Sequence, residues 1–167
     1  MAGSNPRNRA SRSSASEPPA DAETAVWQRA LRLLAARERS GAELAARLRG
    51  AGGTDVAVEA ALARLRALGY LDDGRVAQDA AAQAARRGRG SLYARAKLAA
   101  RGVDPALIDT AIRDHFADEA ALAGSVLARR YEARTPLSPA DRARAGRFLL
   151  QRGFPRAVVL AILGEGC

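Results

Sequence analysis

The sequence holds one cysteine and one histidine among its 167 residues. Cys167 stands at the end of the chain, so no intramolecular disulfide can form and the cysteine content gives no argument for export. With His115 alone, a Ser-His-Asp or Cys-His arrangement has at most one base, and a metal site lacks its usual nitrogen and sulfur ligands. We therefore predict no enzyme, no metal site and no cofactor, with His115 at a helix end where a cationic ring suits the dipole.

Long apolar runs are also missing. No segment approaches the roughly 20 apolar residues that a membrane-spanning helix needs, so we expect no membrane contact. Residues 1–21 are rich in Ser, Pro and Arg and lack the apolar middle of a signal peptide. We interpret them as a disordered, mildly basic tail on a cytoplasmic protein, a tail that keeps the chain soluble rather than one that binds phosphates.

Residues that favour strands are scarce, since aromatic residues make up only 4% of the chain, whereas helix-favouring alanine and arginine are abundant. Helix boundary signals are frequent, namely a capping box at Ser40 and Glu43, a capping oxygen before Pro105 and Pro139, and glycines that follow apolar segments. The sequence predicts an all-α fold with helices over about 22–38, 41–50, 55–68, 73–87, 91–101, 105–116, 119–133, 139–152 and 156–163.

The helices repeat with a period of about fifty residues. Shifting the sequence by 50 or 51 positions aligns four columns of apolar residues or glycine, which are Leu48/Leu98/Leu149, Gly52/Gly102/Gly153, Val58/Ile108/Val159 and Leu62/Ile112/Leu163. Chance similarity among alanine-rich helices is the alternative explanation. We predict three tandem three-helix repeats in an elongated, curved array, with the tail at 1–21 and repeats at 22–72, 73–117 and 118–167.

The net charge of +9 and the pI of about 11.2 favour a nucleic acid or an acidic protein surface as partner. The basic residues concentrate in a stretch without any acid between Asp79 and Asp104, so we expect them to lack a local partner. Leu92 and Leu98 lie among them, and we expect both to pack. A solvated face is the alternative, but such a face normally mixes charges of both signs. We predict a binding face made of Arg86, Arg87, Arg89, Arg95, Lys97 and Arg101.

Two short motifs suggest chemistry at first sight. Asp72 and Asp73 form a carboxylate pair, but their position before a helix favours capping over metal binding. The stretch Arg-Gly-Arg-Gly-Ser at 87–91 lacks both the preceding strand and the Gly-Lys-Ser/Thr ending of a phosphate-binding loop. Neither motif therefore changes the prediction.

Several motifs in order resemble the RecX family of recombination regulators over about residues 28–164. The central corner is Gly69-Tyr70-Leu71-Asp72-Asp73, followed by Arg86-Arg87-Gly88-x-Gly90, by Leu98-x-x-x-Gly102-Val103 and by Ile108. Upstream, Ser40-x-x-Glu43-Leu44 is similar to the first repeat of that family, and Phe148-Leu149-x-x-Arg152-Gly153-Phe154 is similar to its last. We assign Gly69, Tyr70, Leu71, Asp72, Asp73 and Gly102 a structural role.

The resemblance implies three tandem three-helix repeats and a non-enzymatic modulator of the RecA recombinase. A member of this family lodges in the groove of the RecA–DNA filament and restrains ATP hydrolysis and strand exchange. Its expected partners are the filament and, weakly or through the filament, single- and double-stranded DNA, and we expect a monomer. An autonomous DNA-binding helical protein is the alternative, because basic three-helix units also suit helix-turn-helix recognition.

Overall fold

The structure, a computed structural model, describes residues 20–131 and 138–164. These ranges contain no strand and nine α-helices, which are α1 (Ala20–Ala36), α2 (Gly41–Arg49), α3 (Asp55–Ala67), α4 (Asp73–Arg86), α5 (Ser91–Ala100), α6 (Pro105–His115), α7 (Glu119–Tyr131), α8 (Pro139–Gln151) and α9 (Arg156–Leu163). The all-α prediction is confirmed. Residues 20 and 21 belong to α1, so the predicted tail ends too late, because Asp21 suits a first helical turn. The rest of that tail and Cys167 lie outside the described residues.

The helix starts follow the predicted caps. The Ser40 hydroxyl accepts a hydrogen bond from the Glu43 amide, and the Glu43 carboxylate accepts one from the Ser40 amide, which completes the capping box. Asp104 and Ser138 cap the helices that begin at the two prolines. Asp72 caps α4 by accepting from the Arg75 amide, which confirms its capping role. Within the described ranges, no three His, Cys, Asp or Glu side chains gather into a metal site.

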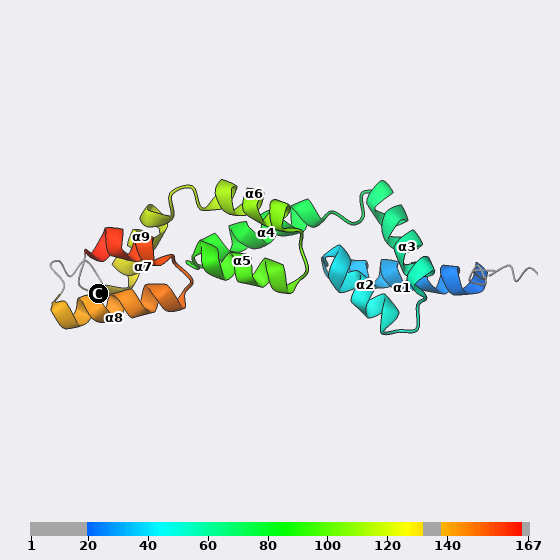
Figure 1. The fold of residues 1–167 in the computed structure, drawn as a ribbon, viewed down its shortest axis with the longest axis horizontal. Helices are drawn as coiled ribbons and strands as arrows, with labels where there is room; N and C mark the ends of the chain where they lie inside the picture. Colours follow the sequence, from blue (N-terminus) through cyan, green and yellow to red (C-terminus); the bar gives the residue numbers. More distant parts are fainter. Residues whose placement is uncertain (1–19, 132–137, 165–167) are drawn as a thin grey trace, which may run out of the picture.

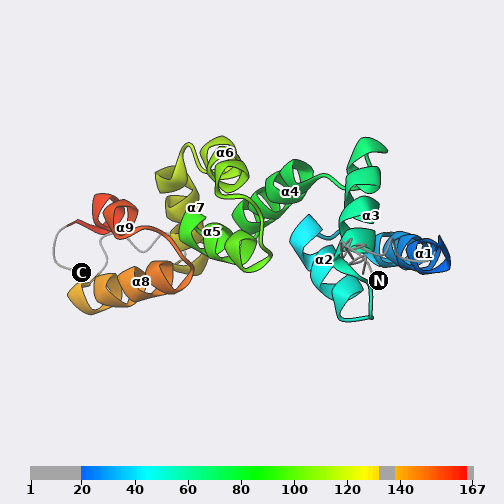
Figure 2. The same cartoon turned by 45° about the vertical axis from the view of Figure 1, so that its right-hand side comes forward.

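The helices form three triplets that follow one another along the molecule (Figures 1 and 2). The main helix–helix packing joins α1 to α3, α4 to α6 and α7 to α9, and every such pair belongs to one triplet. Each triplet has its own apolar core cluster, and Leu122 packs against both the second and the third. The elongated array of three-helix repeats is therefore confirmed. The repeat boundaries at 22–72, 73–117 and 118–167 stay a prediction.

The fifty-residue period corresponds to one corner built three times. Leu48, Leu98 and Leu149 are at most 1% exposed, and the glycine four positions after each has a positive φ, +89°, +69° and +83° in turn. The amide that follows each glycine donates to the carbonyl of that leucine, at 3.0, 3.3 and 3.2 Å. This is the hydrogen bond of a left-handed helix ending, which requires glycine at the turn. The aligned columns therefore mark buried anchors and turns.

Neighbouring triplets meet through two junctions with the same register. At the first junction, Ser40 donates through Oγ to the Arg101 carbonyl at 2.5 Å, and the Gly41 amide donates to Asp73 Oδ1 at 2.8 Å. At the second junction, the Gly90 amide donates to the Arg152 carbonyl at 2.9 Å, and the Ser91 amide donates to Glu119 Oε1 at 2.6 Å. The start of the second helix in one repeat thus docks on the corner of the next repeat.

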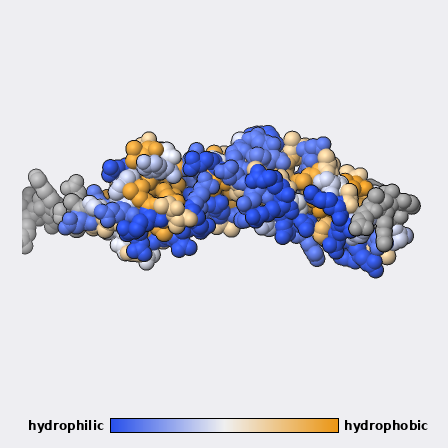
Figure 3. Space-filling view, turned by 180° about the vertical axis from the view of Figure 1, so that it is seen from behind, coloured by the Kyte–Doolittle hydropathy of each residue, from blue (hydrophilic) through white to orange (hydrophobic). Residues whose placement is uncertain are grey.

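The surface is uneven in polarity. Figure 3 shows hydrophilic residues over the middle of the molecule, while hydrophobic atoms appear on the first and third triplets. No helix of the described ranges is long and apolar enough to cross a membrane. The middle of the molecule is therefore the most continuously hydrophilic part of this face.

Candidate functional site

The predicted basic face is divided by ion pairs. Arg95 pairs with Asp109 of α6 at 2.5 Å, and Arg101 pairs with Glu43 of α2 at 3.1 Å. The expectation that these charges lack an acidic partner is wrong for these two arginines. Their acidic partners lie outside the acid-free stretch, on the next helix and in the preceding triplet, but the fold brings these residues into contact.

The packed side of α5 also differs from the prediction. Leu98 is fully buried, as predicted, together with Ala94 and Ser91, which lie on the same side at helical spacing. Leu92 is 51% exposed, so the prediction that it packs is wrong. The reason is that α4 and α6 contact α5 along the Ser91–Ala94–Leu98 side, and Leu92 lies beside this strip rather than on it.

Four of the six predicted residues form no ion pair with any residue that the structure describes. Arg86 and Arg87 are exposed at the end of α4, and Arg89 is half-buried with its guanidinium 4.8 Å from the centre of the Tyr93 ring. Lys97 is exposed and lies one helical turn after Tyr93. These four cations keep their charge available to a ligand.

An open pocket of about 520 Å³ lies at the second junction, between the end of α4, α7 and the end of α8. Gly88, Val126 and Phe148 form part of its wall. The guanidinium groups of Arg130 and Arg152 lie 4.5 and 4.7 Å from the centre of the Phe148 ring. Five arginines line the pocket, namely Arg86, Arg87, Arg129, Arg130 and Arg152.

Arg152 is the most constrained of these arginines. Its Nη1 donates to the carbonyl oxygens of Arg87 and Gly88, at 3.2 and 3.1 Å. Burial lowers the pKa of Arg152, and the nearby charges of Arg89, Arg130 and Arg129 lower that pKa further. Arginine stays charged in proteins, so Arg152 is a cation that is partly removed from water and has other positive charges nearby.

The residues assigned a structural role lie at the first junction and around it. Gly69 has a φ of +70°, Leu71 is buried, and Asp73 accepts the Gly41 hydrogen bond across the junction. A Cβ on Gly102 would come within 2.5 Å of the Ala42 Cβ, so this corner needs glycine for space as well as for φ. Tyr70 is 57% exposed and is not part of the core.

His115 lies at a helix end, as predicted, and also makes a contact that the sequence did not predict. It is the last residue of α6, and its Nε2 lies 2.7 Å from Gln78 Oε1 of α4. This contact ties the end of α6 to α4 within the second triplet.

Comparisons with known proteins agree across most of the chain. The family model described as RecX, first three-helix domain, matches residues 27–65. The regulatory protein RecX of Pseudomonas putida (strain W619) is 34% identical over 86% of this chain and 92% of its own. That of Ectopseudomonas mendocina (strain ymp) is 36% identical over 86% of this chain and 95% of its own. The chain belongs to the RecX family.

Solved RecX structures have the same fold. The crystal structure of RecX from Lactobacillus salivarius superposes with a TM-score of 0.71 at 20% identity and covers 87% of this chain and 97% of that one. A second structure, titled as the crystal structure of regulatory protein RecX, gives a TM-score of 0.71 at 25% identity, with 87% and 73% covered. The helical array is therefore a shared RecX architecture.

The sequence analysis of this RecX chain missed Arg129, Arg130 and Phe148 as site residues and gave Arg152 no role beyond the family pattern. Arg129 and Arg130 lie on α7, more than forty positions after Arg86. A signal did exist, because the 51-residue shift that aligns Gly102 with Gly153 also aligns Arg101 with Arg152. Had the repeat alignment been extended to charged residues, it would have indicated Arg152 at the second junction.

The ion pair at the first junction gives a testable prediction for the stability of the protein. Burial alone would raise the pKa of Glu43, but hydrogen bonds from the Ser40 amide and Arg101, with the charges of Arg101 and Arg37, lower it overall. We expect Glu43→Gln to destabilise the protein by about 1–2 kcal/mol at pH 7 in urea unfolding, since Arg101 loses its charged partner while glutamine still completes the capping box. A carboxylate with a lowered pKa stabilises the fold above its unfolded-state pKa, so the difference should vanish as the pH falls through the folded-state value.

Glu59→Gln is the matched control. Glu59 pairs with Arg49 at 2.8 Å, but both side chains are largely exposed, so we expect its loss to change the free energy of unfolding by less than about 0.5 kcal/mol. Equal effects of the two substitutions would contradict a stabilising role of the junction ion pair.

Proposed function

We propose that this protein is a negative regulator of the RecA recombinase that binds in the groove of the RecA–DNA filament and restrains ATP hydrolysis and strand exchange. The observation that carries the proposal is membership of the RecX family over 86% of the chain, with relatives named regulatory protein RecX. The proposal includes a monomer that acts in the cytoplasm by binding, without a cofactor and without transforming a substrate.

The shape and charge of the array support this proposal. A filament offers a long helical groove with DNA inside, and an elongated row of triplets can contact several protomers at once (Figure 1). Linked weak contacts of this kind add up to a higher overall affinity than any one contact provides. Arg86, Arg87, Arg89 and Lys97, which form no ion pair with a described residue, supply the basic contacts, which meet either DNA or acidic protein surface.

A titration of RecA with this protein tests the proposal. We expect DNA-dependent ATP hydrolysis by RecA to fall at substoichiometric amounts of the added protein, because one array covers several protomers. DNA binding without RecA is measured in parallel. An autonomous DNA-binding protein would leave the hydrolysis rate per bound DNA unchanged and would prefer some sequences, and this result would replace the proposal with that alternative.

A further inference from the structure

The two junctions differ in one charged position. At the first junction, Glu43 lies between two arginines, with Arg101 at 3.1 Å and Arg37 at 3.6 Å. The 50-residue shift places Arg87 where Arg37 stands and Tyr93 where Glu43 stands, and the 51-residue shift places Arg152 where Arg101 stands. Both arginines are thus repeated at the second junction, but a tyrosine replaces the carboxylate.

The replacement leaves the second junction with an excess of positive charge. Within the described ranges, neither Arg87 nor Arg152 forms an ion pair, and Glu119 of this junction uses its carboxylate to accept from the Ser91 amide. Three more arginines line the same pocket, and Arg89 is close enough to affect Arg152. The clustered guanidinium groups repel one another. An anion that enters the pocket is attracted by each of them and reduces this repulsion.

Two of the five pocket arginines are also held in place before any ligand arrives. Two carbonyl oxygens hold the Arg152 guanidinium, and the Phe148 ring supports both Arg152 and Arg130. A group fixed in the free protein loses less conformational entropy on binding. The pocket therefore combines two positioned arginines, Arg130 and Arg152, with three exposed ones that add positive charge.

We propose that the pocket at the second junction binds the backbone phosphates of a nucleic-acid strand. The planar guanidinium fork matches the geometry of phosphate oxygens and binds them in pairs. The inference deepens the proposed function, on which it rests for its biological setting, because it assigns DNA phosphate as the chemistry of one basic contact and adds Arg129, Arg130 and Arg152 to it.

The lining of the pocket favours a nucleic-acid strand over an acidic peptide. Guanidinium groups lie against the Phe148 ring, and Val126 is buried, so the pocket offers little apolar surface for peptide side chains. Protein interfaces depend on such apolar anchors. Beside the pocket, Tyr93 is 36% exposed and gives a ring on which a base can stack, while Lys97 one turn further can meet the next phosphate.

The substitution Tyr93→Glu tests the site by restoring the missing carboxylate. Binding of a fluorescein-labelled oligo(dT) strand is measured by anisotropy without RecA over a range of salt concentrations. We expect the affinity to fall at least about tenfold, with the slope of log affinity against log salt reduced by about 1.4, as for two lost phosphate contacts. Thermal stability should rise, because Arg87 and Arg152 gain the partner that Glu43 provides at the first junction.

Two control substitutions separate the causes. Ala99→Glu adds the same charge at an exposed position of α5 on the side of Arg95, and we expect it to change the affinity less than threefold. Tyr93→Gln removes the ring without adding a charge, so it measures the stacking contribution alone; we expect it to lower the affinity less than Tyr93→Glu does and to leave the salt slope unchanged. If Tyr93→Glu does not fold by circular dichroism, the double substitution of Arg86 and Arg129 by glutamine replaces it, because both side chains are exposed and lie outside the junction hydrogen bonds.

The outcomes decide between the possible ligands. Equal DNA affinity for Tyr93→Glu and Ala99→Glu overturns the proposal. The proposal is also overturned if Tyr93→Glu leaves DNA affinity unchanged but weakens the binding of polyglutamate or of inorganic phosphate. The pocket would then serve an acidic protein or a free phosphate. Because RecA is absent from this assay, failure of the site appears here, whereas failure of the proposed function appears only in the RecA ATPase titration.

Discussion

A variant with glutamate at four basic positions is expected to lose its inhibition of RecA ATP hydrolysis while its helix content stays unchanged. The four positions are the members of the predicted basic face that form no ion pair with a described residue, namely Arg86, Arg87, Arg89 and Lys97. The change lowers the net charge by eight, from +9 to +1, and places repulsive groups where the filament presents phosphates or carboxylates. The measurement is the ATPase titration, with helicity checked by circular dichroism.

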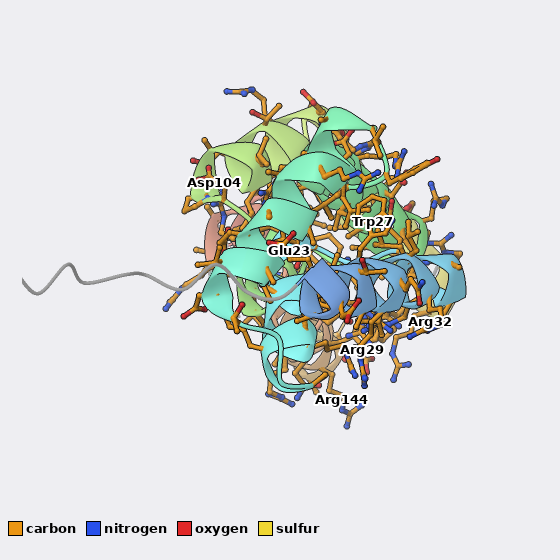
Figure 4. The ribbon with its side chains drawn as sticks, turned by 90° about the vertical axis from the view of Figure 1, so that its right-hand side faces the viewer. Glu23, Trp27, Arg29, Arg32, Asp104 and Arg144 are labelled. Carbon is orange, nitrogen blue, oxygen red and sulfur yellow. The ribbon has the colours of Figure 1, made fainter. Side chains whose placement is uncertain are left out.

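The matched control reverses four exposed arginines elsewhere, namely Arg29, Arg32, Arg47 and Arg156. Figure 4 shows Arg29 and Arg32 pointing away from the molecule, whereas Trp27 of the same helix points toward α3. This variant has the same net charge, so we expect it to retain most of the inhibition if the position of the charges matters. Unchanged inhibition in the first variant would remove the basic face from the mechanism, and equal loss in both would reduce the effect to overall charge.

Truncation of Leu98 to alanine is expected to lower the free energy of unfolding by about 2–5 kcal/mol. Leu98 is fully buried in the core of the second triplet, and its carbonyl accepts the hydrogen bond that closes the corner at Gly102. Removal of its side chain therefore leaves a cavity where α4, α5 and α6 meet. Urea unfolding measures the loss.

Leu92→Ala is the control on the same helix. Leu92 is exposed, so the same truncation should change the free energy of unfolding by less than about 0.5 kcal/mol. Hydrogen exchange adds a regional test, because amides of α4–α6 should exchange faster in Leu98→Ala than those of α1–α3. A small effect of Leu98→Ala, or an equal one from Leu92→Ala, would show that the repeat corner is not the anchor described above.

Local signals made most of the fold predictable from the sequence. Caps such as Ser40 and Asp104 act within one turn of their helix, and a corner such as Leu98 with Gly102 is complete within five residues. The predicted bounds of all nine helices in the described ranges agree with the structure to within two residues. The repeat period was visible for the same reason, since each copy contains its own anchor and turn.

The charged contacts at the junctions were not predictable in this way because they form between repeats. Arg101 pairs with Glu43, which lies 58 positions earlier in the sequence, and Arg152 donates a hydrogen bond to the carbonyl of Arg87, 65 positions earlier. Such contacts depend on how one triplet docks on the next, which hydrophobic periodicity does not report. The acid-free stretch identified the basic residues near the site, but only the junction geometry shows which of them keep their charge.

The repeated docking register gives the molecule a direction. A Cβ on Gly102 or Gly153 would collide with the preceding repeat, whereas one on Gly52 would meet no described residue within 4 Å, so no part of the chain that the structure describes docks against Gly52. Head-to-tail contacts of this type create no two-fold axis. The two ends of the array therefore differ. A binding surface that itself has a direction would accept the array in one orientation only.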